Sequence, residues 1–172
     1  MHSEDKEMKQ AGFTLVELLV TLAIGSVILV GASMSFYQIV WGTGRGNSQV
    51  VALTDVNQAA LAIKKDLMTT QSTDLTDGDP VPQSSVTLSW TDYTGFSSEN
   101  NTSHNCQYTL SGTVLQRTYD GTVSIVARHI TDLGFTQDGR IINVTITATG
   151  PSVPQKSATV EFSGFIRSEV IE

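Results

Sequence analysis

The sequence is poor in cysteine, in basic residues and in aromatic side chains. Its single cysteine, Cys106, excludes a disulfide within the chain. Cys106 lies in a segment of alternating polarity, so we expect a small buried hydrophobe; an intermolecular bridge or a reactive thiol is the alternative. Ten Lys and Arg stand against 17 Asp and Glu, for a net charge of −7. No basic stripe suited to phosphates is present, so we expect no nucleic-acid partner.

The sequence also lacks the common catalytic and metal-binding motifs. It contains no H-E-x-x-H, C-x-x-C or G-x-S-x-G. We expect His104 to lie in a polar, solvated loop, and His129 has no motif around it. Asp74, Asp77 and Asp79 do not have the spacing of an EF-hand, so a solvated acidic loop is expected there, with calcium binding as the alternative. The chain is therefore expected not to be an enzyme and to hold no cofactor or metal.

What the sequence does contain is one long apolar run near its start. The run extends from Phe13 to about Val40 and includes one charged residue, Glu17. As a helix it would be about 42 Å long, more than the ~30 Å hydrocarbon core of a bilayer. Tyr37 and Trp41 lie at its far end, where amphipathic rings favour the headgroup region.

The run divides the sequence into three parts. We expect a leader at residues 1–12, a transmembrane and assembly helix at 13–40 and an exposed domain at 41–172. Lys6 and Lys9 are the only positive charges just before the run, which favours a leader on the cytoplasmic side.

The run opens with GFTLVELLV, from Gly12 to Val20. This stretch closely resembles the processing site of type IV prepilins and pseudopilins. The resemblance implies that prepilin peptidase cuts between Gly12 and Phe13 and that the new N-terminal residue, Phe13, is N-methylated. One departure is the leader, which is usually net basic in this family and here sums to −1 from three acids and two lysines.

Glu17 is costly in this setting and needs an explanation. A carboxylate at mid-bilayer costs roughly 2.5–3.5 kcal/mol on insertion scales. Cleavage after Gly12 creates an α-amine at Phe13, which is also costly when unpaired. The resemblance implies that Glu17 of one subunit faces the amine of a staggered neighbour during assembly. The alternative is a glutamate that snorkels to the interface from near the helix end.

Two other interpretations of the run remain. One is a plain single-pass anchor. The other is a secretory signal peptide, with Val30 and Ala32 as the small residues before a cut at Ser33. Its apolar core would be longer than usual, it would contain Glu17, and its leader would be acidic rather than basic.

Beyond the run, a second helical stretch is predicted at residues 48–72. WGTGRGN, residues 41–47, fits neither phosphate-loop pattern and predicts a flexible or bent joint. One apolar stripe follows helical spacing, and polar residues cover the other side. The stripe consists of Ala52, Val56, Ala59 or Ala60, Ile63 and Leu67; the polar side consists of Gln49, Asn57, Lys64 and Asp66.

Strand patterns dominate the remainder. Loops are predicted at 70–85 and 96–105, strands at 85–90 and 122–130 (the latter also readable as a helix edge), and hairpins over 106–119 and 141–167. The predicted fold is α+β, with a long N-terminal membrane and amphipathic helix packed on a mostly antiparallel β-sheet, as in pilins.

The hydrophobic pattern of four C-terminal segments resembles that of the J-type pseudopilins of type II secretion and of the W-type minor pilins. These segments are SSVTLSW, YTLSGTVLQR, VARHITDLGF and INVTITAT. This implies a minor subunit, at the tip of a type IV pilus or a type II secretion pseudopilus, that helps to initiate assembly. Implied partners are prepilin peptidase, other pilin or pseudopilin subunits and the inner-membrane assembly platform. The implied location is the cytoplasmic membrane, single-pass, with the C-terminal domain outside the cytoplasm, and the fibre after assembly.

Different functions fit the same residues. One is a binding minor pilin for adhesion or DNA uptake. Another is a membrane-anchored or secreted β-domain unrelated to pili. The sequence leaves open whether secretion, adhesion, motility or DNA uptake is served, and which sister subunits bind.

Overall fold

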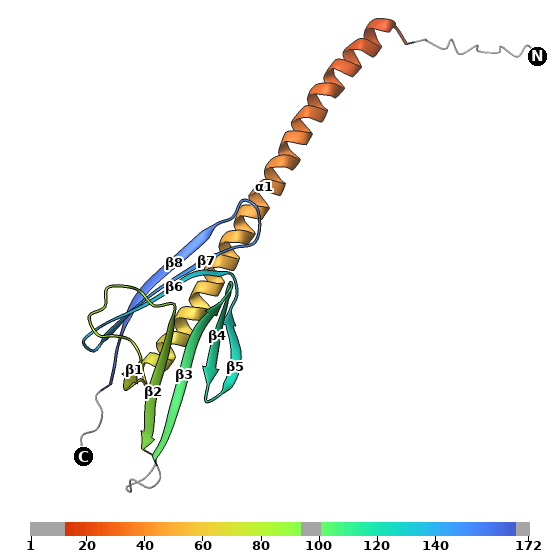
Figure 1. Cartoon of the computed structure of the whole chain (residues 1–172). Helices are drawn as coiled ribbons and strands as arrows, with labels where there is room; N and C mark the ends of the chain where they lie inside the picture. Colours follow the sequence, from red (N-terminus) through yellow and green to blue (C-terminus); the bar gives the residue numbers. More distant parts are fainter. Residues whose placement is uncertain (1–12, 94–100, 168–172) are drawn as a thin grey trace, which may run out of the picture. The chain divides into compact units, whose positions relative to one another are not determined.

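The computed structural model describes residues 13–93 and 101–167. The chain divides into two units, residues 1–42 and 43–172, and each is described by itself. One helix, α1, and eight strands are found in the described residues (Figure 1). Their bounds are α1 Leu15–Leu67, β1 Ser72–Thr73, β2 Ser85–Tyr93, β3 Asn101–Ser111, β4 Val114–Tyr119, β5 Thr122–Ala127, β6 Ile130–Asp138, β7 Ile141–Thr149 and β8 Ser157–Phe165.

The strands form two antiparallel sheets rather than one. The first has the order β1-β2-β3-β4-β5 and the second the order β6-β7-β8. Tyr119, Asp120, Gly121 and Thr122 make the β4–β5 turn, with positive φ at both central residues, as an Asp-Gly hairpin turn requires. The α+β class, with a long N-terminal helix packed on antiparallel sheets, is confirmed.

The C-terminal part of α1 packs against both sheets through the predicted stripe. Every position of that stripe is buried: Ala52, Val56, Ala59, Ala60, Ile63 and Leu67. The core is completed by alternate residues of the strands, including Leu88, Tyr108, Phe135 and Ile146. Figure 1 shows strands of both sheets beside this part of the helix. An apolar stripe at 3.6-residue spacing thus holds the domain together.

The helical hydrogen bonding of α1 runs through WGTGRGN, so no break in the helix marks the predicted joint at residues 41–47, although the boundary between the two units falls within it. One glycine of the segment, Gly44, packs closely against the domain. A Cβ on Gly44 would lie 2.6 Å from the carbonyl oxygen of Val153 in the β7–β8 connection, and a Cβ on Gly150 would lie 2.0 Å from that of Ser48. The Ser48 hydroxyl accepts a 2.9 Å hydrogen bond from the backbone N–H of Lys156. Glycine here permits a close approach between helix and connection.

Replacing Gly44 and Gly46 of this segment with alanine should therefore change the free energy of unfolding in opposite directions. Gly44→Ala is expected to lower the free energy of unfolding by about 1–2 kcal/mol, since the clash outweighs the gain in helix propensity. Gly46→Ala, with nothing within 4 Å of the added Cβ, is expected to raise it by up to about 1 kcal/mol. Urea unfolding of the full chain in detergent measures both. Equal effects of the two variants would contradict the packing role of Gly44.

Several predicted boundaries need correction. The helix ends at Leu67 rather than residue 72, because Thr69 and Thr70 turn their hydroxyls back to the Asp66 carbonyl, each at 2.8 Å. The segment predicted as one element at 122–130 is two strands, interrupted at His129, whose φ is 56°. The hairpins over 106–119 and 141–167 are confirmed.

The loop predicted at 96–105 is partly wrong. Residues 101–105 belong to β3, whereas residues 94–100 lie outside the described residues. Strand β6 was not predicted, since Asp132 and Gly134 interrupt the apolar pattern that marks a strand.

Asp66 is not on the polar side of the helix, as predicted, but is buried beneath the first sheet. Arg117 of β4 holds its carboxylate bidentately, with Nε 2.7 Å from Oδ2 and Nη2 3.0 Å from Oδ1. Tyr108 and Cys106 of β3 donate to Oδ2 from 2.5 and 3.2 Å. These four residues, the Asp66 cluster, join the last turn of α1 to the sheet by charge-assisted hydrogen bonds.

The Asp66 cluster also explains the cysteine. Cys106 is buried, as expected for a small hydrophobe. Burial, followed by the neighbouring Asp66 carboxylate, raises the pKa of the Cys106 thiol to about 12. The thiol is therefore protonated at neutral pH, and the chemistry of a reactive cysteine, which requires a thiolate, is not favoured.

Candidate processing and assembly site

The start of α1 is a capped helix end. Phe13 and Thr14 precede the helix, and the Thr14 hydroxyl accepts a 3.3 Å hydrogen bond from the backbone N–H of Glu17. The Thr14 carbonyl accepts from Glu17 and Leu18 at 3.1 and 3.2 Å. Threonine followed three residues later by glutamate, before an apolar run, is the pattern of a capping box. The sequence reasoning missed this second role of the segment, although the T-x-x-E spacing signals it.

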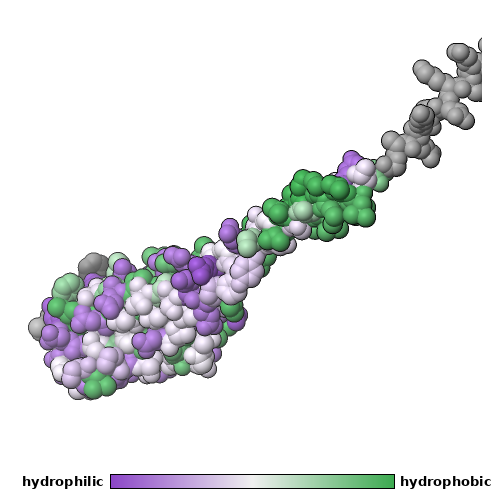
Figure 2. Space-filling view, turned by 90° about the horizontal axis from the view of Figure 1, so that it is seen from above, coloured by the Kyte–Doolittle hydropathy of each residue, from purple (hydrophilic) through white to green (hydrophobic). Residues whose placement is uncertain are grey.

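The surface of α1 that follows the cap is apolar on all sides. Its large hydrophobic side chains are exposed, and Figure 2 shows a green patch of hydrophobic residues on this part of the helix. They are Phe13, Leu15, Val16, Leu18, Leu19, Val20, Leu22, Ile24, Val27, Ile28, Leu29, Val30, Met34, Phe36, Tyr37, Ile39, Val40 and Trp41. By length and composition, α1 is able to cross a membrane. An all-round apolar helix suits lipid or other apolar helices.

Four serine and threonine hydroxyl groups within this segment are paired with carbonyl groups of the same helix. Thr21 and Ser26 donate to the carbonyls three residues before them, and Ser33 and Ser35 to those four residues before, at distances of 2.7–3.0 Å. Polar groups in hydrocarbon must be satisfied within the protein. These hydroxyls are therefore compatible with a lipid environment.

The predicted site residues are placed as follows. Gly12 lies outside the described residues. Phe13 is 77 % exposed, and Glu17 is exposed within the first turn of α1. Residues 13–42 contain no Lys, Arg or His. The Glu17 carboxylate therefore has no basic side chain within the described part of its own unit, although the positive end of the helix dipole lies close to it.

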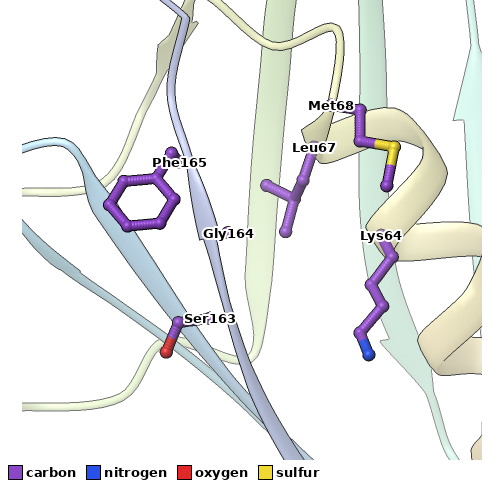
Figure 3. Close-up of a pocket in the computed structure, with 6 residues that line it drawn as sticks. All are labelled: Lys64, Leu67, Met68, Ser163, Gly164 and Phe165. Atoms are coloured by element: carbon purple, nitrogen blue, oxygen red, sulfur yellow. The ribbon is translucent and has the colours of Figure 1, made fainter.

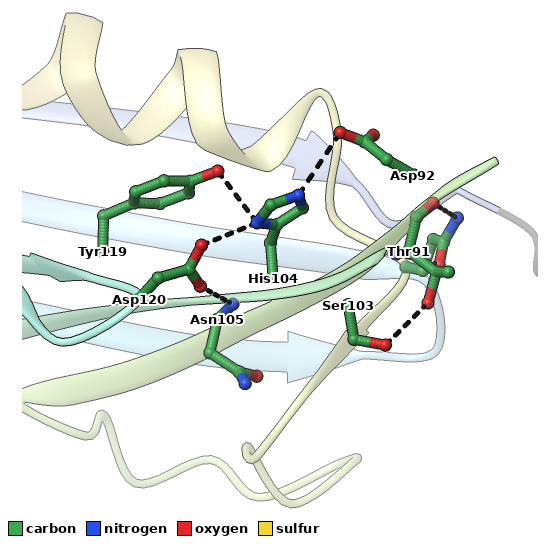
Figure 4. Close-up of polar contacts among 8 residues, drawn as sticks. Thr91, Asp92, Ser103, His104, Asn105, Tyr119 and Asp120 are labelled. Atoms are coloured by element: carbon green, nitrogen blue, oxygen red, sulfur yellow. Dashed lines mark hydrogen bonds and ion pairs between the residues drawn. The ribbon is translucent and has the colours of Figure 1, made fainter. Parts of the chain in front are cut away.

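The domain offers a second polar cluster, which corrects the expectation for His104. This residue lies in β3, with its side chain only 18 % exposed, and not in a solvated loop. Its Nδ1 lies 2.6 Å from Asp120 Oδ2 and 3.0 Å from the Tyr119 hydroxyl, and its Nε2 lies 3.5 Å from Asp92 (Figure 4). The His104 ring stacks on Tyr119 with centroids 5.6 Å apart, and Trp90 lies tilted beside it at 5.8 Å.

This cluster supports structure more readily than chemistry. The other oxygen of Asp120 accepts a 2.9 Å hydrogen bond from the backbone N–H of Asn105. That bond, followed by the one to His104, lowers the pKa of Asp120. Among the described residues, the polar partners of His104 are the carboxylates of Asp120 and Asp92 and the Tyr119 hydroxyl. The cluster ties the β4–β5 turn to β3.

The remaining histidine, His129, joins the strands to α1. Its Nδ1 lies 2.9 Å from Asp55 Oδ2, and the other Asp55 oxygen accepts from the Arg128 backbone N–H at 3.3 Å. Asp55 therefore fixes the connection between β5 and β6, where His129 adopts a left-handed backbone conformation.

The three aspartates of the acidic loop accept hydrogen bonds from backbone N–H groups, two of which lie outside the loop. Asp74 accepts from the N–H of Thr87 at 2.8 Å, and Asp79 accepts from that of Val81 at 2.9 Å. Asp77 accepts from the N–H of Gly139 at 2.6 Å. Within residues 13–93 and 101–167, no three His, Cys, Asp or Glu side chains are grouped as metal ligands would be.

An apolar pocket of about 480 Å³ lies between the last turn of α1 and the end of β8. Lys64, Leu67 and Met68 line it from the helix side, and Ser163, Gly164 and Phe165 from the strand (Figure 3). Lys64 lies over the Phe162 ring at 4.8 Å. Among the residues that line the pocket, Lys64 is the one charged side chain.

Comparison with known proteins identifies the N-terminal segment. The family model for the prokaryotic N-terminal methylation motif matches residues 8–33. Neither a curated protein nor a solved structure matches the chain. The motif indicates a type IV pilin-like or pseudopilin-like precursor, a class whose members are structural subunits. It implies processing by prepilin peptidase and assembly with other pilins. These comparisons do not support the resemblance to J-type or W-type subunits.

Proposed function

We propose that this chain is a structural subunit of a type IV pilus or of a type II secretion pseudopilus. It is made as a precursor in the cytoplasmic membrane and is cut between Gly12 and Phe13. The observation that carries the proposal is the methylation motif at residues 8–33, which coincides with a capped helix whose exposed apolar surface contains one carboxylate.

In this proposal Glu17 pairs with the methylated α-amine of Phe13 on a neighbouring subunit. Both positions are exposed, and residues 13–42 supply no cation to Glu17. In an apolar environment an unpaired carboxylate and an unpaired ammonium are each costly, whereas the pair removes both penalties. The remaining surface of Phe13–Val40 packs against the equivalent helices of other subunits.

The proposal also assigns a location and a place in the fibre. Lys6 and Lys9 favour a leader on the cytoplasmic side, which puts the β-strand domain outside the cytoplasm. The resemblance of the strand segments to J-type and W-type subunits supports a minor subunit at the tip, assembled through the inner-membrane platform. No basic patch favours DNA as a ligand of this acidic chain.

The mature N-terminus tests the proposal directly. Mass spectrometry of the protein from native membranes should find a chain that starts at Phe13 and carries one extra methyl group. Gly12→Leu should leave Met1 in place, whereas Gly31→Ala, which meets nothing within 4 Å, should be processed normally. An intact wild-type chain would indicate a plain anchor, and a start at Ser33 a secreted domain; either result refutes the proposal.

A further inference from the structure

Three of the four sheet edges in the domain are protected against additional strands. β1 has only two residues. Along β6, Gln83 and Phe135 exchange two main-chain hydrogen bonds of 2.9 Å, so the segment before β2 covers this edge. β8 carries a charged residue, Glu161, at its centre. Short edges, covered edges and charged edges are the usual ways in which proteins prevent strand addition.

The fourth edge, β5, has none of these three protections over Thr122–Ile125, although a register shift between Leu115 and Gln116 interrupts its pairing at Val126. Its sequence, TVSIVA, contains no charged residue and no proline. Among the described residues, β5 has β4 as its sole strand neighbour. Val123 and Ile125 are 60 % and 53 % exposed. In an edge strand, alternate residues direct both main-chain N–H and C=O groups outward, and these match another extended strand.

The face that adjoins this edge is also free of charge. The register places Val123 beside Thr118 and Gln107, and Ile125 beside Gln116 and Thr109. Arg117 and Leu115 alternate with these residues and point to the core side. In a chain with a net charge of −7, the outer surface next to β5 thus presents only amides, hydroxyls and two β-branched apolar side chains.

From these observations we infer that the free edge of β5 binds an extended strand of a neighbouring subunit in the same fibre. This inference rests on the proposed function. The added strand pairs its main chain with β5 and places uncharged, apolar or β-branched residues beside Val123 and Ile125, because such cross-strand pairs are favourable and a charge there has no partner. The strand is an example of β-augmentation, in which main-chain bonds supply affinity and side chains supply specificity.

A second copy of this chain is a poorer occupant. Two identical β5 strands pair antiparallel about a two-fold axis perpendicular to the sheet. That axis reverses the direction of every element that lies parallel to the sheet, including the part of α1 that belongs to the domain. In the two copies the chain therefore enters the domain at residue 43 from opposite directions, which does not suit subunits anchored side by side in one membrane, whereas a strand from a different subunit is free of this restriction.

Hydrogen exchange of the full-length processed protein tests main-chain pairing. Those amides of Thr122–Ala127 that face away from β4 are expected to exchange at least tenfold more slowly in isolated fibres than in the membrane-held subunit. Ile125→Lys should reduce incorporation into fibres at least tenfold, whereas the matched change Thr159→Lys, at an exposed position of β8, should leave it unchanged. Unaltered exchange in β3 of the membrane-held Ile125→Lys chain shows that the variant is folded.

A photo-crosslinking amino acid at Val123 then identifies the occupant. Adducts to an extended segment of a sister subunit, absent from the Ile125→Lys chain, support the inference. Adducts to a second copy, or wild-type fibres in which the β5 amides exchange as in the free subunit, overturn it while the proposed function stands. A correctly processed wild-type chain that never enters fibres overturns the proposed function and this inference together.

Discussion

Replacing Asp66 with alanine is expected to lower the free energy of unfolding by about 3 kcal/mol. The change leaves Arg117 without its bidentate partner and the buried Tyr108 hydroxyl without its acceptor. Removal of one member of a buried ion pair typically costs about 3–5 kcal/mol, and the lower end applies because the Arg117 side chain is 25 % exposed. Urea unfolding of the full chain in detergent, followed by near-ultraviolet circular dichroism, measures the loss.

The control for this prediction is Asp132→Ala, which removes an exposed carboxylate and should change the free energy of unfolding by less than about 0.5 kcal/mol. A loss of similar size in both variants would show that general charge, rather than the Asp66 cluster, stabilises the domain. Conversely, an Asp66→Ala chain as stable as the wild type would mean that the last turn of α1 is held by the apolar stripe alone.

The same cluster predicts a pH dependence. Burial by itself raises the pKa of Asp66, but the hydrogen bonds from Arg117, Tyr108 and Cys106 outweigh it, so the pKa lies below its ordinary value. The folded state then binds this proton less readily than the unfolded state. The resulting stabilisation is complete above the unfolded-state pKa of about 4 and disappears as pH falls through the folded-state pKa. The wild type should therefore lose stability relative to Asp66→Asn below about pH 4, and a constant difference would contradict this.

Glu17→Gln is expected to reduce incorporation into fibres at least tenfold while membrane insertion and cleavage continue. Glutamine is accepted at the third position of a capping box, so the variant keeps the helix start. It loses only the negative charge that the proposed function requires opposite the Phe13 amine of a neighbour. The measurement compares the amounts of processed protein in sheared fibres and in membranes.

Thr14→Ala provides the matched control for Glu17→Gln. It removes the hydroxyl that accepts from the Glu17 N–H, at a cost of roughly 1 kcal/mol, and keeps the carboxylate. This variant should assemble far better than Glu17→Gln. If both variants fail equally, the helix cap rather than the charge is what assembly needs; if Glu17→Gln assembles normally, the proposed pairing is wrong.

The sequence predicted those parts of the fold that depend on local periodicity. The stripe from Ala52 to Leu67 could be located because helical spacing repeats over several turns, and the hairpins could be located from alternation with turn residues. The packing role of Gly44 could not be predicted, because its partner, the backbone near Val153, lies more than a hundred residues away and gives no local signal.

Charged and polar residues misled the sequence reasoning for a related reason. Asp66 was assigned to the solvent side because an isolated carboxylate is rarely buried, yet Arg117 compensates for it from another element. The residues next to His104 in the sequence are polar, which indicated a loop. In the structure they lie on the outer face of β3, where they alternate with residues of the core side. The Asp120-Gly121 hairpin turn, by contrast, carried a recognisable signal that was overlooked.

The candidate site was accessible to sequence reasoning because its pattern is contiguous. The segment from Gly12 to Glu17 is a local motif, and the same residues fall within the matched methylation motif. Which surfaces of the domain meet other subunits was not accessible, since the exposure of Val123 and Ile125 depends on strand order.

The position of the helix cap affects how a protease would bind this chain at the bond after Gly12. A peptidase binds its substrate as an extended backbone, and a scissile bond inside a helix must first be unwound. Because the first helical residue is Leu15 and Thr14 terminates the hydrogen-bonded ladder, the bond after Gly12 lies before the helix. The proposed cleavage between Gly12 and Phe13 would therefore leave the first turn of α1 intact, with Phe13 one residue from the cap.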